Sequence, residues 1–366
     1  MTKVKIVEDL ISAYISNDQQ KIISLLEKEI QSSKKKGQYN VVKRLKNLVH
    51  KIPAKKSLSA QSTSIKSVVQ IGEENLLYEK INSSISLDEI VLDLPLKNTI
   101  ISFLEEWDDY SKLSKHGIFP TNKLLFYGPP GTGKTKLAYA IANYLNFPLI
   151  FVRLDELISS YLGKTGKNIR EIFEIARHEN VVILLDEIDT VAKNRDDSKE
   201  LGELKRIVTV LLQNIDVFPH NSIIVGATNN EFLLDKAVWR RFNLKLQFEL
   251  PSLMSRELLF RLFVEGFSAN INFSLLAELT EGLTGSMIFD ISQAIKRQAI
   301  LSGKKTNDIG VIKSVFSYGN ISNNDSKIPK RNIYKMCQIL KDGGFSLKDV
   351  EVATGIPYTT LRDNIA

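Results

Sequence analysis

Hydrophobic residues recur with a helical period over the first fifty residues of the chain. Between positions 3 and 51 they stand three or four residues apart, and Gly37 interrupts the pattern. This spacing gathers them on one face of each of three short amphipathic helices. We therefore predict a small helical bundle over residues 1–52, followed by a linker over residues 53–84, whose Ser/Lys-rich start lacks any period.

The pattern changes near residue 85, where short apolar runs begin to alternate with helical stretches. The apolar runs cover residues 124–127, 149–154, 181–185, 222–227 and 244–248. Strands that alternate with helices in this way form a parallel sheet covered by helices on both faces. We predict an α/β domain over residues 85–251, which Pro251 ends.

Beyond Pro251 the sequence predicts helices only. Residues 252–317 form a small helical domain in this interpretation, and a polar linker follows over residues 318–330. The last unit, residues 331–366, contains three helical stretches separated by glycine-containing turns, an arrangement typical of a helix-turn-helix.

The positive charge of the chain is concentrated at its N-terminal end. Residues 1–66 hold 14 Lys and Arg against 5 Asp and Glu, whereas the whole chain carries a net charge of +7. A basic segment favours an acidic partner such as nucleic acid, an acidic protein face or an anionic membrane; a solvated helical face is the alternative.

The single cysteine, Cys337, excludes an intrachain disulfide. No apolar run approaches the ~20 residues that span a bilayer, so we expect a cytoplasmic protein without a membrane partner.

The strongest chemical signal is the segment Gly-Pro-Pro-Gly-Thr-Gly-Lys-Thr at residues 128–135. It fits G-x-x-x-x-G-K-[ST] and lies between an apolar run and a helical stretch, the setting in which this motif binds phosphates. Glycines let backbone N–H groups form a concavity for the phosphates, and the positive end of the helix faces the same anion. Lys134 can reach the β/γ oxygens, and the Thr135 hydroxyl can hold Mg²⁺. We expect ATP to contact Gly128, Pro129, Pro130, Gly131, Thr132, Gly133, Lys134, Thr135, Lys136 and Leu137.

Polar residues follow the next strands. Asp186 and Glu187 come directly after an apolar run, at the strand end where ligands bind in open α/β sheets. We assign Asp186 to the Mg²⁺ shell and Glu187 to the attacking water; the alternative is an acidic pair that caps a helix. Asn229 follows the next apolar run, and we assign it to the water and the γ-phosphate.

Arg240 and Arg241 stand side by side about ten residues beyond Asn229. Their guanidinium groups can bind phosphate oxygens in a bidentate way. They could act within their own subunit, serve as arginine fingers for a neighbour's ATP, or complement a helix dipole. The sequence leaves open which of the two is the principal finger.

The segments GPPGTGKT, VVILLDEID, GATNN and LDKAVWRRF occur in the order and spacing of the AAA family of AAA+ ATPases, which residues 85–317 resemble. The resemblance implies a RecA-like domain with a small helical lid, in a ring, usually a hexamer, with ATP at subunit interfaces. It also implies that Gly285 lies at the start of the lid helix that contacts adenine. No lid arginine stands there, which favours the AAA family proper, alongside spastin- and katanin-like or protease-coupled members. The N-terminal bundle is similar in architecture to the microtubule-interacting-and-trafficking bundles of some relatives, which implies adaptor or substrate docking.

Tyr161, Leu162 and Gly163 resemble the first pore loop of that family. In a hexamer, Tyr161 side chains would line the axis and grip an extended polypeptide through apolar contact; a core aromatic is the alternative. Lys164 departs from the family, which often has an acid after this glycine.

Three classes of function follow, and Glu187 argues against one of them, a non-motor scaffold that uses ATP only to assemble; the other two remain. The first is an ATP-driven, ring-forming remodeller or unfoldase of protein substrates; no protease motif occurs, so any peptidase would be a separate chain. The second is a DNA-associated ATPase of regulation, transposition or defence, in which Tyr358, Thr359, Thr360 and Arg362 face a DNA groove. Glu351 departs from the helix-turn-helix pattern and the basic supply is thin, so a protein-interaction role is the alternative for this unit.

Overall fold

The computed structural model of the chain describes residues 78–154, 165–192, 198–267, 271–303, 307–321 and 330–365. The predicted N-terminal bundle and the pore-loop residues Tyr161, Leu162 and Gly163 lie outside these residues.

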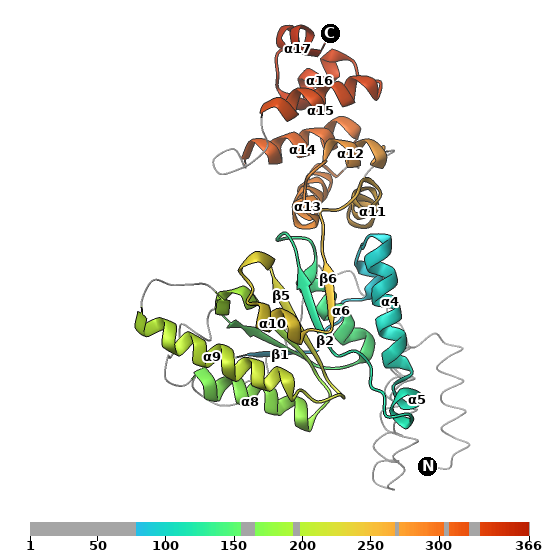
Figure 1. The fold of residues 1–366 in the computed structure, drawn as a ribbon. Coiled ribbons are helices and arrows are strands. Elements are labelled where there is room, and N and C mark those ends of the chain that lie inside the picture. The colour runs from blue at the N-terminus through green and yellow to red at the C-terminus, as the bar shows by residue number, and fades with distance from the viewer. Residues whose placement is uncertain are drawn as a thin grey trace, which may run out of the picture. The chain divides into compact units, whose positions relative to one another are not determined.

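A six-stranded sheet lies at the centre of the α/β domain (Figure 1). Its strands are β1 (Glu79–Ile81), β2 (Lys123–Tyr127), β3 (Leu149–Arg153), β4 (Val182–Asp186), β5 (Ile223–Thr228) and β6 (Leu244–Gln247). They lie in the order β1-β3-β4-β5-β2-β6. Strands β2 to β6 are parallel, as the apolar runs predict, and β1 pairs with β3 antiparallel at one edge.

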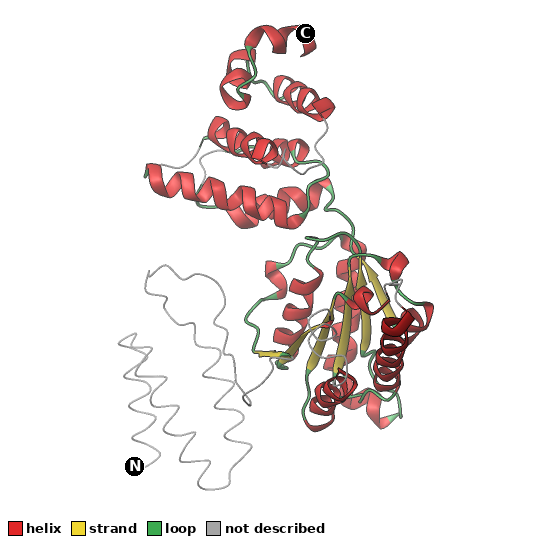
Figure 2. Ribbon diagram, turned by 90° about the vertical axis from the view of Figure 1, so that its left-hand side faces the viewer, coloured by secondary structure: helices red, strands yellow, loops and turns green. Residues whose placement is uncertain are grey.

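Helices cover both faces of this sheet (Figure 2). On one face lie α4 (Leu94–Asp108) and α6 (Lys134–Leu145); α5 (Tyr110–Lys115) follows α4. On the other lie α8 (Thr165–His178), α9 (Ser198–Asp216) and α10 (Lys236–Arg241). The short 3₁₀ turns are η1 (Leu87–Glu89), η2 (Ile188–Ala192) and η3 (Glu231–Leu233).

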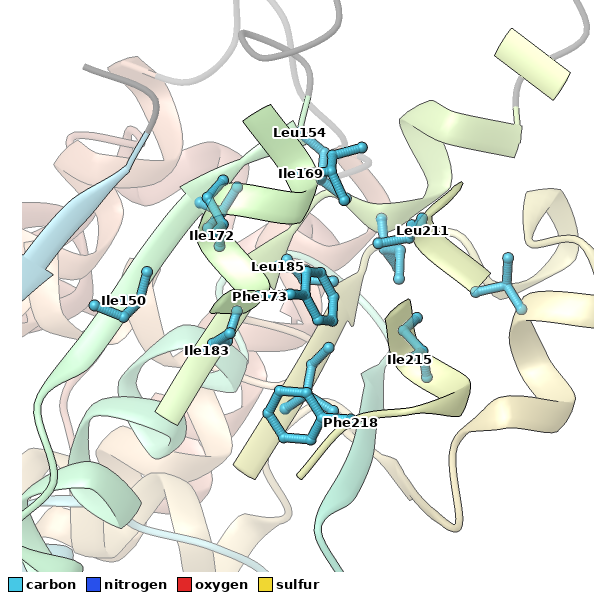
Figure 3. Packing of buried hydrophobic residues seen from close by; sticks show 14 of the residues in the cluster. Ile150, Leu154, Ile169, Ile172, Phe173, Ile183, Leu185, Leu211, Ile215 and Phe218 are labelled. Atoms are coloured by element: carbon cyan, nitrogen blue, oxygen red, sulfur yellow. The ribbon is translucent and has the colours of Figure 1, made fainter. Parts of the chain in front are cut away.

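The central strands β2 to β5 are largely apolar because both of their faces are buried. Along β4, Val182 and Leu184 pack toward α4 and α6, whereas Ile183 and Leu185 pack toward α8 and α9. Figure 3 shows the second of these cores, in which the ring of Phe173 meets that of Phe218 edge-on at 5.9 Å between centroids. Burial on both faces removes the alternation that marks a half-exposed strand.

Helices α11 (Leu253–Val264), α12 (Phe273–Leu279), α13 (Gly285–Ser302) and α14 (Asp308–Ile321) form the helical part that the sequence predicts after Pro251. Each of the first three begins at a capping side chain. Ser252 accepts from the Ser255 N–H, Asn272 from the Leu275 N–H, and Thr284 from the Met287 N–H. Such caps satisfy N–H groups that the first helical turn leaves without a partner.

The C-terminal helices α15 (Lys330–Asp342), α16 (Leu347–Thr354) and α17 (Tyr358–Ile365) follow the predicted pattern. Their apolar side chains do not form a core of their own. They share one with α12 and α14, in which Leu275 and Phe316 pack in the same cluster as Cys337 and Leu361. The sequence did not predict this shared core. Among the helices of the described ranges, none is long and apolar enough to cross a membrane.

Candidate functional site

The loop between β2 and α6 has a backbone that only glycine can adopt at two critical points. Gly128 has a φ of 133°, and a Cβ there would lie 2.0 Å from the Phe248 carbonyl oxygen. Gly131 has a φ of 74°, and a Cβ there would lie 2.2 Å from Ser286 Oγ. Both conformations are left-handed or nearly so, which side chains disfavour. The loop therefore packs too closely against Phe248 and Ser286 to carry side chains at these two positions.

Lys134, the first residue of α6, is a buried cation at the base of this loop. Its Nζ donates to the carbonyl oxygens of Gly128 and Pro129, each at 2.7 Å. Burial lowers the pKa of Lys134 to about 8, against the attraction of the Asp186 and Asp189 carboxylates. A buried cation is stabilised by an anion, so this position favours a negatively charged ligand.

The helical part contacts the loop at the start of α13. The Ser286 N–H donates to the Gly131 carbonyl oxygen at 3.0 Å, and a Cβ on Gly285 would lie 3.3 Å from that same oxygen. Lys136 donates instead to the Glu89 carbonyl at 2.9 Å, and Leu137 is buried in the sheet core. Gly285 thus lies beside the phosphate loop, whereas the side chains of Lys136 and Leu137 are engaged elsewhere.

Asp186 and Glu187 form a tight turn at the end of β4. The Glu187 N–H donates to Asp186 Oδ1 at 3.0 Å, and Glu187 has a φ of 52°. The Thr190 N–H and hydroxyl both donate to the Glu187 carbonyl, at 2.9 and 2.8 Å. The carboxylate of Glu187 is exposed, while Asp186 is partly buried.

Asn229 comes directly after β5, and its side chain is exposed. Because β5 lies between β4 and β2, the residue falls between the acidic turn and the phosphate loop at one edge of the sheet. Thr228, opposite Tyr127 in the β2–β5 pair, is buried and donates to Asp189 Oδ1 at 2.8 Å. The sequence reasoning missed this pair, although Asp189 three residues after Asp186 was a visible signal.

The two arginines at the end of α10 differ in their surroundings. Arg241 forms an ion pair with Asp216 of α9 at 3.2 Å and donates to the Ala237 carbonyl at 2.9 Å. Arg240 is exposed and, within the described part of the chain, its guanidinium makes no hydrogen bond or ion pair. The described contacts of Arg241 are thus with α9 and α10 and not with the phosphate loop.

Comparisons with known proteins agree with this geometry. Residues 124–250 match the ATPase family associated with various cellular activities (AAA). The chain is 32% identical over 282 residues to a proteasome-activating nucleotidase of Sulfurisphaera tokodaii, which covers 73% of this chain and 69% of that protein. The chain belongs to the AAA family of ATPases.

Two further relatives match shorter stretches of this AAA ATPase. One is an uncharacterised AAA family ATPase of Sinorhizobium fredii, 42% identical over 173 residues, 47% of this chain and 52% of that protein. The other is a chloroplastic ATP-dependent zinc metalloprotease of Arabidopsis thaliana, 34% identical over 218 residues, 56% of this chain and 26% of that protein. The chain thus spans about a quarter to about two thirds of these three relatives. Family membership confirms the predictions of an ATPase and of a RecA-like α/β fold.

The loop of this AAA ATPase fits a nucleotide. The backbone at Gly128 and Gly131 leaves no room for side chains, and Lys134 supplies a buried positive charge at the loop. Thr135 and Asp186 offer the oxygen ligands that Mg²⁺ prefers. These residue types match a triphosphate with its metal ion.

The C-terminal helices of this ATPase explain one departure from the helix-turn-helix pattern. Glu351 Oε1 accepts from the Tyr358 N–H at 3.0 Å, so this carboxylate caps the start of α17. Arg362 on the exposed side of α17 pairs with Asp363 at 3.2 Å. The helix therefore offers DNA phosphates a single arginine, which has a carboxylate beside it.

Proposed function

We propose that this chain is an ATP-driven, ring-forming remodeller that hydrolyses ATP at subunit interfaces and pulls on a polypeptide. One observation carries the proposal. The phosphate loop, the two carboxylates and Asn229 follow three neighbouring strands of one sheet, whereas Arg240 extends from α10 without a partner in the described residues. A site that has its binding loop and its base in one subunit, and an arginine left over, is suited to completion by a neighbouring subunit.

The chemistry would be divided among the residues of one subunit as follows. Lys134 and the loop amides would hold the β- and γ-phosphates, and Thr135 and Asp186 would hold Mg²⁺, which neutralises phosphate charge when bound. Glu187 would accept a proton from the attacking water, and Asn229 would orient that water. Gly285 and the first turn of α6 would complete the nucleotide pocket.

We assign the principal finger to Arg240. Asp216 and the Ala237 carbonyl hold the guanidinium of Arg241 within its own subunit, so that group is less suited to reach a neighbour. Arg241 would then fix the end of α10, from which Arg240 extends. The developing charge on a transferred phosphoryl group is where such an arginine acts.

We infer the ring and its substrate from the family resemblance and from the names of relatives. Proteasome-activating nucleotidases are among them, which favours a protein substrate, a homo-oligomeric ring, usually a hexamer, and a protease on a separate chain. Tyr161, Leu162 and Gly163 would grip that substrate in the pore, and residues 1–52 would select it. A cytoplasmic location fits this role.

The proposal does not extend to DNA. The C-terminal helices share their core with α12 and α14, and the charge of Arg362 is paired with Asp363. Both observations favour a protein-interaction role for residues 331–366, or a purely structural one.

A Glu187→Gln variant of the full chain tests the proposal. It keeps the size of the side chain but removes the base, so it should bind ATP, enlarge to a ring in sizing chromatography and turn over very slowly. Glu171→Gln, which changes an exposed carboxylate on α8, is the matched control and should hydrolyse ATP normally. Normal turnover by Glu187→Gln, or failure to enlarge with ATP, would contradict the proposed mechanism.

The polypeptide-pulling step needs its own variant. Tyr161→Ala should keep ATP hydrolysis and ring assembly while losing the unfolding of a tagged, folded test protein, because an aromatic grip is lost. Tyr144→Ala, an exposed tyrosine on α6, serves as the control. Full unfolding activity in Tyr161→Ala would rule out the pore-loop role without affecting the ATPase assignment.

A further inference from the structure

A buried hydrogen-bonded pair links two strand ends behind the proposed site. The Thr228 hydroxyl donates to Asp189 Oδ1 at 2.8 Å and accepts from the Asn230 N–H at 3.0 Å. The exposed fraction is 1% for Thr228 and 7% for Asp189. A hydroxyl has one proton to donate, so the Asp189 carboxylate fixes its orientation and directs a lone pair at the Asn230 N–H.

The position of this pair along the chain gives it a specific consequence. Thr228 is the last residue of β5, and Asn230 begins the following turn η3 as its cap. Asn229 lies between them and has an exposed side chain. Its backbone is therefore anchored on one side by a strand residue and on the other by the hydroxyl of Thr228.

Asp189 belongs to the acidic segment at the other end of this link. It follows Asp186 by three residues in the turn η2, after β4, and β4 is paired with β5. The pair thus joins the turn that carries Glu187 to the turn that carries Asn229. A rigid connection of this kind would keep the two groups in a constant relative position, which catalysis by positioned groups requires.

We propose that Asp189 is a positioning residue for ATP hydrolysis, which acts through the Thr228 hydroxyl to hold Asn229 in place. The inference rests on the proposed function of Asn229. The role of Asp189 is indirect, because its hydrogen bond is to the Thr228 hydroxyl and not to the nucleotide. Loss of the Thr228 hydroxyl should slow hydrolysis and leave nucleotide affinity nearly unchanged, because its described contacts are with Asp189 and the Asn230 N–H and not with the phosphate loop.

Stability alone cannot test the proposal. Thr228→Val keeps the shape of the side chain but leaves a buried carboxylate without its donor, which is destabilising whatever the role of the pair. The decisive measurement is a double-mutant cycle on kcat with Asn229→Ala, carried out on the assembled full-length protein. Nucleotide affinity is followed with a fluorescent ADP analogue, and thermal unfolding is recorded for every variant.

We expect Thr228→Val to lower kcat about 10- to 100-fold, by analogy with the loss on removing hydrogen-bond partners of metal ligands. Thr228→Ser should restore most of the loss because it retains the hydroxyl. In the Asn229→Ala background, Thr228→Val should cost little more, since the group that it positions is already absent. Asp189→Ala breaks the same hydrogen bond from the other side and replaces Thr228→Val if that variant folds poorly. Its effect on kcat should also be non-additive with that of Asn229→Ala.

Two results would overturn the inference while leaving the assignment of Asn229 intact. In the first, the fold-decrease in kcat caused by Thr228→Val is as large in the Asn229→Ala background as in the natural chain. In the second, kcat is unchanged in both Thr228→Val and Asp189→Ala. If Asn229→Ala alone leaves kcat unchanged, the assignment of Asn229 is wrong and this inference is wrong with it. The ATPase mechanism would then still be judged separately, by Glu187→Gln.

Discussion

The backbone N–H of Glu187 donates to the carboxylate of Asp186, its chain neighbour, at 3.0 Å. This bond closes a turn in which Glu187 adopts the left-handed region, with a φ of 52°. A residue with a side chain pays about 1–2 kcal/mol for that conformation. The strain coincides with the residue that we propose as the base, which is where strained backbone often occurs in enzymes.

The protein should therefore be more stable with glycine at position 187 than with alanine there. Both Glu187→Gly and Glu187→Ala remove the carboxylate and should abolish turnover, but only glycine relieves the φ of 52°. We expect Glu187→Gly to exceed Glu187→Ala in free energy of unfolding by about 1 kcal/mol, measured by denaturant titration. Equal stability of the two variants would mean that the left-handed turn is not kept in solution.

Substitution of Arg240 should affect catalysis, whereas substitution of Arg241 should affect stability. Arg240→Ala should lower kcat by about 10³-fold or more without changing the melting temperature, because it loses only a contact with a neighbour's nucleotide. Arg241→Ala should lower the melting temperature slightly, since a partly exposed ion pair is worth about 0–1 kcal/mol. Asp216→Ala is the control and should resemble Arg241→Ala.

Subunit mixing identifies the neighbour's role directly. Rings mixed from Arg240→Ala and Lys134→Ala subunits should regain part of the activity that each variant lacks alone. Some interfaces in such rings join an intact phosphate loop to an intact Arg240. A mixture that stays as inactive as its components would contradict an arginine acting across the interface.

The sequence predicted the parallel strands and the residues at their ends because both depend on local pattern. A strand buried on two faces is a continuous apolar run, and Asp186 and Asn229 follow such runs directly. The phosphate loop is equally local, since its glycines and Lys134 are contiguous. Ligand sites at the carboxyl ends of parallel strands then follow from topology.

Features that depend on distant residues were not predictable. Strand β1 has three residues and exists because it pairs with β3, about seventy positions away. The shared core of the C-terminal helices depends on Leu275 of α12 meeting residues beyond position 330. Nothing in the amphipathic pattern of a short helix says which other helix will cover its apolar face.

The thiol of Cys337 gives that shared core a pH signature. Burial raises its pKa from 9.0 to about 11. Between these values the unfolded chain has released the proton and the folded chain has not, so stability falls as pH rises from about 9 to 11. Unfolding free energies of the natural chain and of Cys337→Ala should converge over this range. A constant difference between them would contradict the burial of the thiol.

Cys337 is also the only cysteine of the chain, so its labelling reports on the packing of the C-terminal helices. It is fully buried in the apolar cluster to which α12 contributes Leu275. Leu275→Ala should cost about 2–5 kcal/mol locally and speed the reaction of Cys337 with a thiol reagent many-fold. Leu246→Ala, an equivalent truncation in the sheet core, should leave the labelling rate nearly unchanged. Equal rates in the natural chain and in Leu275→Ala would mean that the C-terminal helices pack independently of α12.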